Sequence, residues 1–210
     1  MNFARCLRIL LTGALVLGGC DTSINSSIDI PDGESRSGSL MSVNGDISIG
    51  KDCMIEGASR SVNGSVKVGD RSRVEDLNAV NGSIRTGEDV SVNGNVESVN
   101  GAVELGAGSE VSGKVTTVNG SIELDQTVVQ RDVRTVNGDI EIRNKSVVKG
   151  DIVIEGKKGD SSRSRPIEIE VTGGSIIEGD IVVKRSVDVR LILRDGGKVL
   201  GQVDGAEVIN

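Results

Sequence analysis

Few residues in this chain of 210 belong to the types that perform acid–base or nucleophilic chemistry. The chain has no His, Trp or Tyr, and its three cysteines are Cys6, Cys20 and Cys53. Without His, neither a Ser-His-Asp nor a Cys-His arrangement can form. The sequence also contains no zinc-ligand cluster and no complete phosphate-binding loop of the form Gly-x-x-x-x-Gly-Lys-Ser/Thr. We therefore expect no catalytic residues, no cofactor and no enzymatic activity.

Three aspartates carry carboxylates of the kind that calcium sites use. Asp139, Asp151 and Asp180 each follow a glycine directly, and they would bind calcium only if the fold grouped them. Asp after Gly is also a common turn residue that accepts backbone hydrogen bonds. We favour the turn interpretation and predict no metal site.

Cys20 stands at the end of a segment that is typical of secretion signals. Arg5 and Arg8 precede an apolar run over 9–17 that is too short to cross a bilayer as a helix. The run ends in Leu-Gly-Gly-Cys, and residues 1–19 with this ending resemble the signal peptide of bacterial lipoproteins. The resemblance implies cleavage before Cys20 and a lipid on its thiol. The alternative is an ordinary secretory signal in which Cys20 has no role.

The same resemblance implies a location. A lipid on Cys20 would anchor the protein to a membrane of the bacterial cell envelope, on the periplasmic side. Asp21 resembles the inner-membrane retention signal of enteric bacteria, and the choice between inner and outer membrane stays open.

Removal of residues 1–19 would leave Cys53 as a lone internal cysteine, which excludes an intrachain disulfide. We predict that Cys53 is a small buried residue, the alternative being a reactive thiol. Loss of Arg5 and Arg8 would also change the net charge from −7 to −9. An acidic surface repels phosphate groups, so we expect no nucleic-acid partner, and no small-molecule substrate either.

The body of the chain is organised around a repeated tripeptide. Val-Asn-Gly recurs at steps of 19, 18, 19, 19 and 18 residues and is followed by an apolar-x-apolar pair such as Ile122 and Leu124; the copies begin at Val43, Val62, Val80, Val99, Val118 and Val136. A second row, such as 111–115, lies half a turn later and explains an off-beat copy at Val92. Such a period is typical of repeat architectures.

We therefore predict an all-β fold, a single-stranded parallel β-helix (β-solenoid) of 18–19 residues per circuit. It should cover residues 39–210 in roughly 7–8 circuits. Residues 20–38 are rich in Ser, Asp and Asn and contain Pro31, which predicts a flexible tether.

Equivalent residues of successive circuits should stack. The Val-Asn-Gly asparagines would then form a column of hydrogen-bonded amides; they are Asn44, Asn63, Asn81, Asn100, Asn119 and Asn137. We expect the following Gly to supply a positive φ and the Val to pack inward. The alternative is that Asn-Gly is merely a common turn dipeptide.

An insertion over 157–166 interrupts the rhythm. It carries the cations Lys157, Lys158, Arg163 and Arg165 on an acidic chain, and insertions in solenoids are often where partners bind. We treat it as a candidate partner loop, the alternative being a solvated loop.

The repeated rows of the sequence resemble those of two protein families. The Val-Asn-Gly-Ser/Asp-Ile rows, over about residues 40–185, resemble bacterial β-strand-repeat lipoproteins that are classed as adhesins. The rows at 149–152 and 178–181 resemble the bactofilins, which are polymer-forming β-helices. The resemblances imply a non-catalytic envelope adhesin or scaffold, or alternatively a self-assembling polymer. A polysaccharide-active β-helix enzyme is a third possibility. The partners implied are the membrane, through the lipid, and a second copy or an envelope component.

Overall fold

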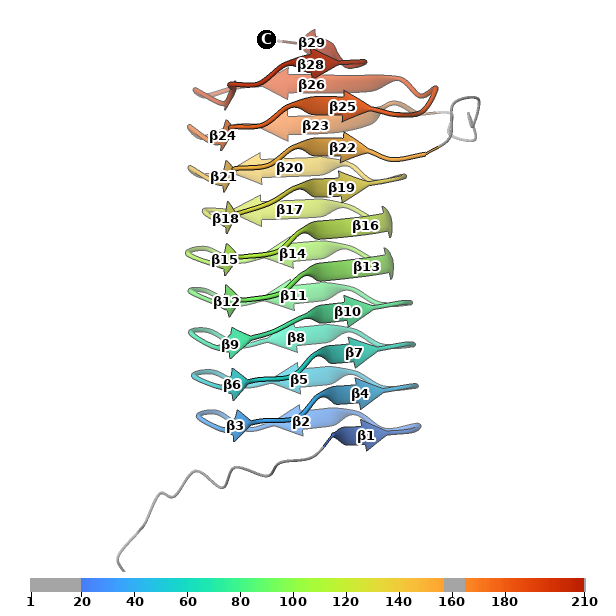
Figure 1. The fold of residues 1–210 in the computed structure, drawn as a ribbon, viewed down its shortest axis with the longest axis vertical. Helices are drawn as coiled ribbons and strands as arrows, with labels where there is room; N and C mark the ends of the chain where they lie inside the picture. The colour runs from blue at the N-terminus through green and yellow to red at the C-terminus, as the bar shows by residue number, and fades with distance from the viewer. Residues whose placement is uncertain (1–19, 157–164, 210) are drawn as a thin grey trace, which may run out of the picture.

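The computed structural model describes residues 20–156 and 165–209, and in these ranges the chain forms a straight rod of short strands with no helix (Figure 1). Three parallel sheets run along the rod, and each circuit of the chain adds one strand to each sheet in turn. The fold class predicted from the sequence, a parallel β-solenoid, is confirmed.

Sheet A has ten strands in the order β1 (Asp21–Ser23), β4 (Leu40–Ser42), β7 (Ser59–Ser61), β10 (Leu77–Ala79), β13 (Val96–Asn100), β16 (Val115–Asn119), β19 (Val133–Thr135), β22 (Ile152–Ile154), β25 (Ile181–Val183) and β28 (Val203–Asp204). Sheet B has ten: β2 (Ile28–Ile30), β5 (Ile47–Ile49), β8 (Val66–Val68), β11 (Ile84–Thr86), β14 (Val103–Leu105), β17 (Ile122–Asp125), β20 (Ile140–Arg143), β23 (Ile167–Val171), β26 (Val189–Leu193) and β29 (Glu207–Ile209).

Sheet C has nine: β3 (Ser35–Arg36), β6 (Met54–Ile55), β9 (Arg73–Val74), β12 (Ser91–Val92), β15 (Glu110–Val111), β18 (Val128–Val129), β21 (Val147–Val148), β24 (Ile176–Ile177) and β27 (Lys198–Val199). The cross-section is therefore a three-sided coil. The corner from sheet A to sheet B carries Val-Asn-Gly, and we call it the VNG corner.

The rod has ten circuits, so the predicted 7–8 circuits are too few. At about 4.8 Å per circuit, ten circuits span about 45 Å. One of the uncounted circuits lies at the N-terminal end. Strands β1, β2 and β3 lie within residues 21–36 and pair in register with β4, β5 and β6.

This arrangement corrects the expectation of a flexible tether over residues 20–38. Ile28 and Ile30 are buried and pair with Ile47 and Ile49, so they form an ordinary apolar-x-apolar step of the coil. The segment looked like a linker because its corner is made of Ser and Asn rather than Val-Asn-Gly. Cys20, which is exposed, directly precedes β1.

The insertion enters at the VNG corner of the eighth circuit, between β22 and β23. Ile140 pairs with Ile169 across a step of 29 residues, and the stacking continues without a break. Residues 1–19, Lys157, Lys158 and Arg163 lie outside the described residues; Arg165 is described.

Along each strand the side chains alternate between the interior and the surface. In sheet B one interior column consists of Ile, Val and Leu residues with no solvent exposure, among them Ile47, Val66, Ile84, Val103, Ile122 and Ile140. Burial of one such side chain stabilises the fold by about 1.5–3 kcal/mol. Stacking thus provides the core that aromatic residues supply in other folds. Among the described residues no helix is long and apolar enough to span a membrane.

Candidate functional site

The VNG corner is the most regular feature of the rod, and its asparagines form one continuous column. The six predicted asparagines lie one above another, and the Nδ2 group of each donates to the Oδ1 atom of the preceding one; a seventh, Asn25, begins the column in the first circuit. The N···O distances from Asn44 to Asn137 are 2.6, 2.8, 2.7, 2.9, 2.9 and 2.9 Å. We call this column the asparagine ladder.

The glycine of the corner has a different role from the predicted one. No described residue with positive φ stands at a Val-Asn-Gly glycine, so the expected left-handed conformation is wrong. A Cβ atom on Gly101 would lie closer than 3.0 Å to the carbonyl carbon and oxygen of Gly82 in the circuit below. Gly64, Gly82, Gly120 and Gly138 are in the same position. Glycine is therefore required by the close approach of stacked corners.

The valine of the corner does not pack inward as expected. Val80 and Val99 are 37% and 39% exposed, and the other four valines are partly exposed. The preceding residue takes the interior position, because sides alternate along a strand. Each corner therefore presents a half-exposed valine beside an asparagine.

A column of buried hydroxyls, which was not among the predicted features, lies behind the valines. Ser61, Ser98 and Thr117 each donate to the carbonyl oxygen of a corner glycine 16 residues earlier, at 3.0, 3.1 and 3.2 Å. The sequence contains a signal for this column, since Ser or Thr precedes Val-Asn-Gly in five of the six copies that are spaced by 18 or 19 residues. These bonds tie the corner of one circuit to the strand of the next.

Arg185 ends the asparagine ladder at the point where the insertion replaces the corner. Its Nη1 atom donates to Asn137 Oδ1 at 2.8 Å and to the Val136 carbonyl oxygen at 3.0 Å. The residue is only 5% exposed, and its Nε and Nη2 atoms have no hydrogen-bond partner among the described residues. A guanidinium thus supplies the donor that the next asparagine would have supplied.

Arg165, the described cation of the candidate partner loop, forms an ion pair with Asp139. Asp139 Oδ1 also accepts the backbone N–H of Glu168 at 3.1 Å. Asp139 therefore fixes the position at which the chain rejoins the rod.

Asp151 and Asp180 stand at the third corner, from sheet C to sheet A, and accept backbone hydrogen bonds. Asp180 N–H donates to Asp151 Oδ1 at 2.9 Å, and Gln202 N–H donates to Asp180 Oδ1 at 2.7 Å. Asn95 Oδ1 likewise accepts the backbone N–H of Lys114 at 2.9 Å. Within the described ranges no three side chains of His, Cys, Asp or Glu form a group that could hold a metal ion.

Asp132 occupies the same corner and is held ionised. Burial alone would raise its pKa, but the hydrogen bond from Arg134 at 2.7 Å, the backbone N–H of Asp151 and the charge of Arg134 together lower the pKa below the ordinary aspartate value.

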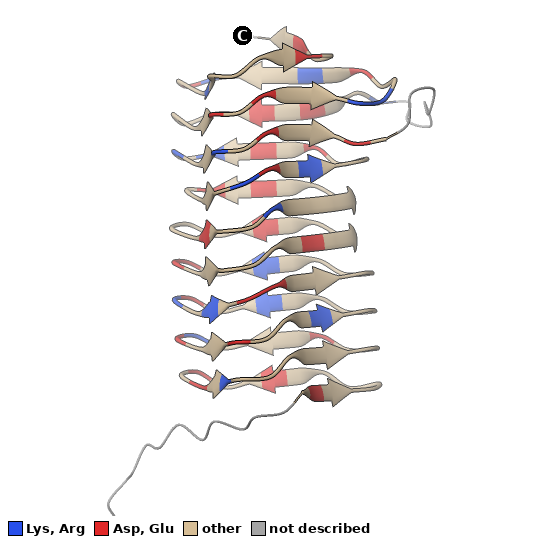
Figure 2. Ribbon diagram, viewed as in Figure 1, with Lys and Arg blue, Asp and Glu red and all other residues tan. Residues whose placement is uncertain are grey.

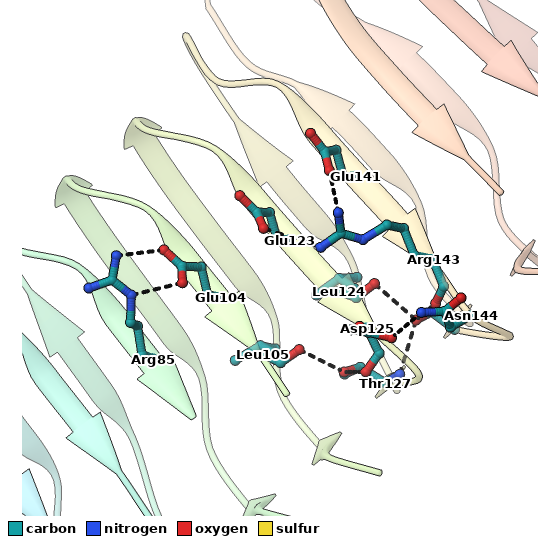
Figure 3. Close-up of polar contacts among 11 residues, drawn as sticks. Arg85, Glu104, Leu105, Glu123, Leu124, Asp125, Thr127, Glu141, Arg143 and Asn144 are labelled. Carbon is teal, nitrogen blue, oxygen red and sulfur yellow. Dashed lines mark hydrogen bonds and ion pairs between the residues drawn. The ribbon is translucent and has the colours of Figure 1, made fainter. Parts of the chain in front are cut away.

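The outer face of sheet B carries an acidic stripe, visible in Figure 2. Glu104, Glu123, Glu141 and Glu170 stack in register on consecutive circuits. Three arginines partly neutralise them: Arg194, whose Nη1 atom lies 3.5 Å from Glu170, and Arg85 and Arg143, which Figure 3 shows. Arg85 donates to both oxygens of Glu104 at 2.8 Å, and this bond raises the pKa of Arg85. Arg143 lies between Glu123 and Glu141, at 3.3 and 3.0 Å.

A shallow hollow of about 230 Å³ lies beside this stripe, lined in part by Arg85, Glu104, Glu123 and Arg143. Its charged groups are already paired with one another. The arrangement suits a polar surface that rests against a partner more than a pocket that activates a substrate.

Cys53 is 2% exposed, and its thiol lies 3.1 Å from the carbonyl oxygen of Pro31. Its position is equivalent to that of Ser72, whose hydroxyl donates to the Gly50 carbonyl oxygen at 2.8 Å. The burial agrees with the expected small interior residue, because the thiol takes a place that hydroxyls occupy in other circuits.

Comparisons of this chain with protein-family models, with curated proteins and with solved structures give no match.

Proposed function

We propose that this chain is a non-catalytic, lipid-anchored protein of a bacterial envelope that serves as an adhesin or scaffold. The observation that carries the proposal is the place of Cys20, which is exposed and directly precedes the first strand of the rod. A lipid on its thiol would attach the rod by one end without a spacer. The other end would then stand about 45 Å away, at about 4.8 Å per circuit.

The surface of the rod supports a role in contact rather than catalysis. Many of its polar groups are bonded to one another, as in the asparagine ladder and the arginine–glutamate pairs of sheet B. Ten stacked circuits give a stiff body, because each circuit is bonded to its neighbours along three sheets. Stiffness and a repeating surface suit a protein that holds or spaces other molecules.

The test is metabolic labelling with an alkyne-tagged fatty acid in a bacterial host. Cys20→Ser should abolish the label and move the protein out of the membrane fraction. Cys53→Ser is the matched control and should keep both, since a serine hydroxyl already fills this position in the next circuit. Label that persists in Cys20→Ser would contradict the anchor.

Adhesion or scaffolding is tested separately with the same variants. Cells that lack the gene should lose attachment or envelope integrity, and the Cys53→Ser protein should restore it while the Cys20→Ser protein should not. Full restoration by Cys20→Ser would show that the function does not depend on the anchor.

A further inference from the structure

The two ends of the rod differ in chemistry, although both leave strand edges unpaired. At the C-terminal end the outermost strands of the three sheets are β27, β28 and β29. Val199, Val203 and Val208 pair there with the core residues Ile177, Ile181 and Leu191, and Val208 is 47% exposed. Ile209 is 36% exposed but pairs with Ile192, which lies on the outer face of sheet B above Glu170. Val208 continues the interior column of Leu191, with which it pairs. The end thus displays an apolar cross-section of the core, framed by free backbone donors and acceptors.

At the N-terminal end, charged groups take interior positions. Arg36 pairs with Ile55, and Asp21 pairs with Leu40, both of which are core residues of the second circuit. Arg36 Nη2 lies 2.6 Å from Glu34, and its Nε lies 3.9 Å from Asp21. An apolar partner on this end would have to desolvate these charges, which is unfavourable. The described N-terminal end is therefore a poor surface for an apolar partner, although its strand edges are unpaired.

We propose that the C-terminal end binds the C-terminal end of a second copy of this chain. The partner has to present three short strand edges around an apolar centre of the same shape, and another C-terminal end offers that surface. Two copies related by a twofold axis across the rod would place their edge strands antiparallel and bury Val208 and its neighbours. Such an interface is self-complementary and closed.

Because charged groups lie at the N-terminal end of the first circuit, we expect the assembly to stop at two copies. A rod with an apolar surface at both ends would add copies without limit, as in a filament, whereas the rod of described residues has an apolar surface at its C-terminal end and charged groups at the other. The interface is small, because only residues 198–209 form the edge strands and their turns. Stable interfaces use about 20–30 residues a side, so we expect a dissociation constant in the micromolar range, on the order of 10 µM. The proposal is independent of the lipid.

Spin labels placed at the two ends test the proposal. In the full chain with Cys20→Ser, Asp204→Cys labels the C-terminal end and Thr22→Cys labels the N-terminal end; both sites are exposed, and the remaining Cys53 is buried. Pulsed dipolar spectroscopy at about 100 µM, roughly ten times the expected dissociation constant, should show intermolecular coupling between Asp204→Cys labels. Thr22→Cys labels should show none, since they would lie about 90 Å apart at about 4.8 Å per circuit.

A second pair of variants tests the contact itself. Val208→Asp should weaken the dimer at least tenfold, because it places a carboxylate in the apolar centre of the interface. Ile24→Asp, which changes an isoleucine that is 68% exposed near the other end, should leave the dimer unchanged. Absence of coupling at Asp204→Cys, coupling between Thr22→Cys labels, or coupling between the two kinds of label in a mixture would each overturn the proposal.

Discussion

Replacement of Asn100 by Ala breaks the asparagine ladder near its middle. The Asn100 amide donates to Asn81 Oδ1 and accepts from Asn119 Nδ2, both at 2.9 Å. Alanine keeps the backbone conformation available and removes both bonds.

The expected loss follows from the number of bonds and their exposure. One neutral hydrogen bond contributes about 0.5–1.5 kcal/mol net. The asparagines are exposed, so water can bond to the amides left behind at Asn81 and Asn119, and the lower half of this range applies. We expect Asn100→Ala to lower the free energy of unfolding by about 1–2 kcal/mol.

The assay is urea unfolding followed by far-ultraviolet circular dichroism, since the chain has no Trp or Tyr to report by fluorescence. Stacked repeats can open from their ends, so amide hydrogen exchange in β13 and β16 should be measured as well. The control is Asn78→Ala, because Asn78 faces outward from β10 without a side-chain hydrogen bond to any described residue. Equal losses in Asn100→Ala and Asn78→Ala would refute the ladder as a source of stability.

Three further tests address contacts at the corners of the rod. Gly101→Ala should destabilise the fold by about 2–3 kcal/mol, because the new Cβ atom would collide with the circuit below. Gly33→Ala should cost only about 1 kcal/mol, because the Cβ atom has free space there and only the φ of 75° is unfavourable. The urea midpoints of the two variants measure these losses. Thr117→Val should lower the free energy of unfolding by about 1–2 kcal/mol, because the hydrogen bond to Gly101 is lost. Thr135→Val should be neutral or stabilising, because the buried Thr135 hydroxyl has no partner among the described residues. Equal urea midpoints within the glycine pair or within the threonine pair would contradict the assigned contacts. The pKa of Asp132 is lowered in the folded state, so its contribution to stability is present above the unfolded-state pKa near 3.9 and is lost as the pH falls through the folded-state pKa. Asp132→Asn should therefore make the melting temperature fall less steeply below about pH 4. An unchanged dependence of the melting temperature on pH would contradict this.

The coil and its ladder could be predicted because they depend on the period alone. Identical residues at steps of 18 or 19 must superpose when parallel strands stack in register, so Asn119 falls above Asn100 wherever the coil forms. The alternation around Ile122 and Leu124 likewise defines one buried side of a strand. Neither inference needs the details of the corner.

The orientation of the corner could not be predicted from the apolar character of valine. Position in the strand decides it: Ser61 ends β7 facing inward, so Val62 must face outward. Recognising this would have required Ser59–Ser61 to be read as a strand, and a serine-arginine-serine segment has almost no apolar signal. Stacking compensates for that weakness, since Leu77 and Ala79 pair directly with the two serines.

The first circuit was missed for a related reason. Its corner contains Ser26 and Ser27 in place of Gly and Ser, and a single Asn25 carries the ladder position. Local composition therefore resembled a linker, and the tertiary pairing of Ile28 and Ile30 with the next circuit decides the structure. Stacking on the neighbouring circuit thus orders a segment whose own sequence would not predict strands.

The most direct test of the account is one intramolecular distance along the rod. With Cys20→Ser, spin labels at Thr22→Cys and Asp204→Cys lie on the outer face of sheet A, nine circuit steps apart. Diluted with unlabelled protein, the pair should give a single narrow distribution near 43 Å plus the label arms, at about 4.8 Å per step. A broad distribution, as a flexible N-terminal segment would give, or a distance shorter by several circuits, would contradict a continuous ten-circuit rod that begins at Cys20.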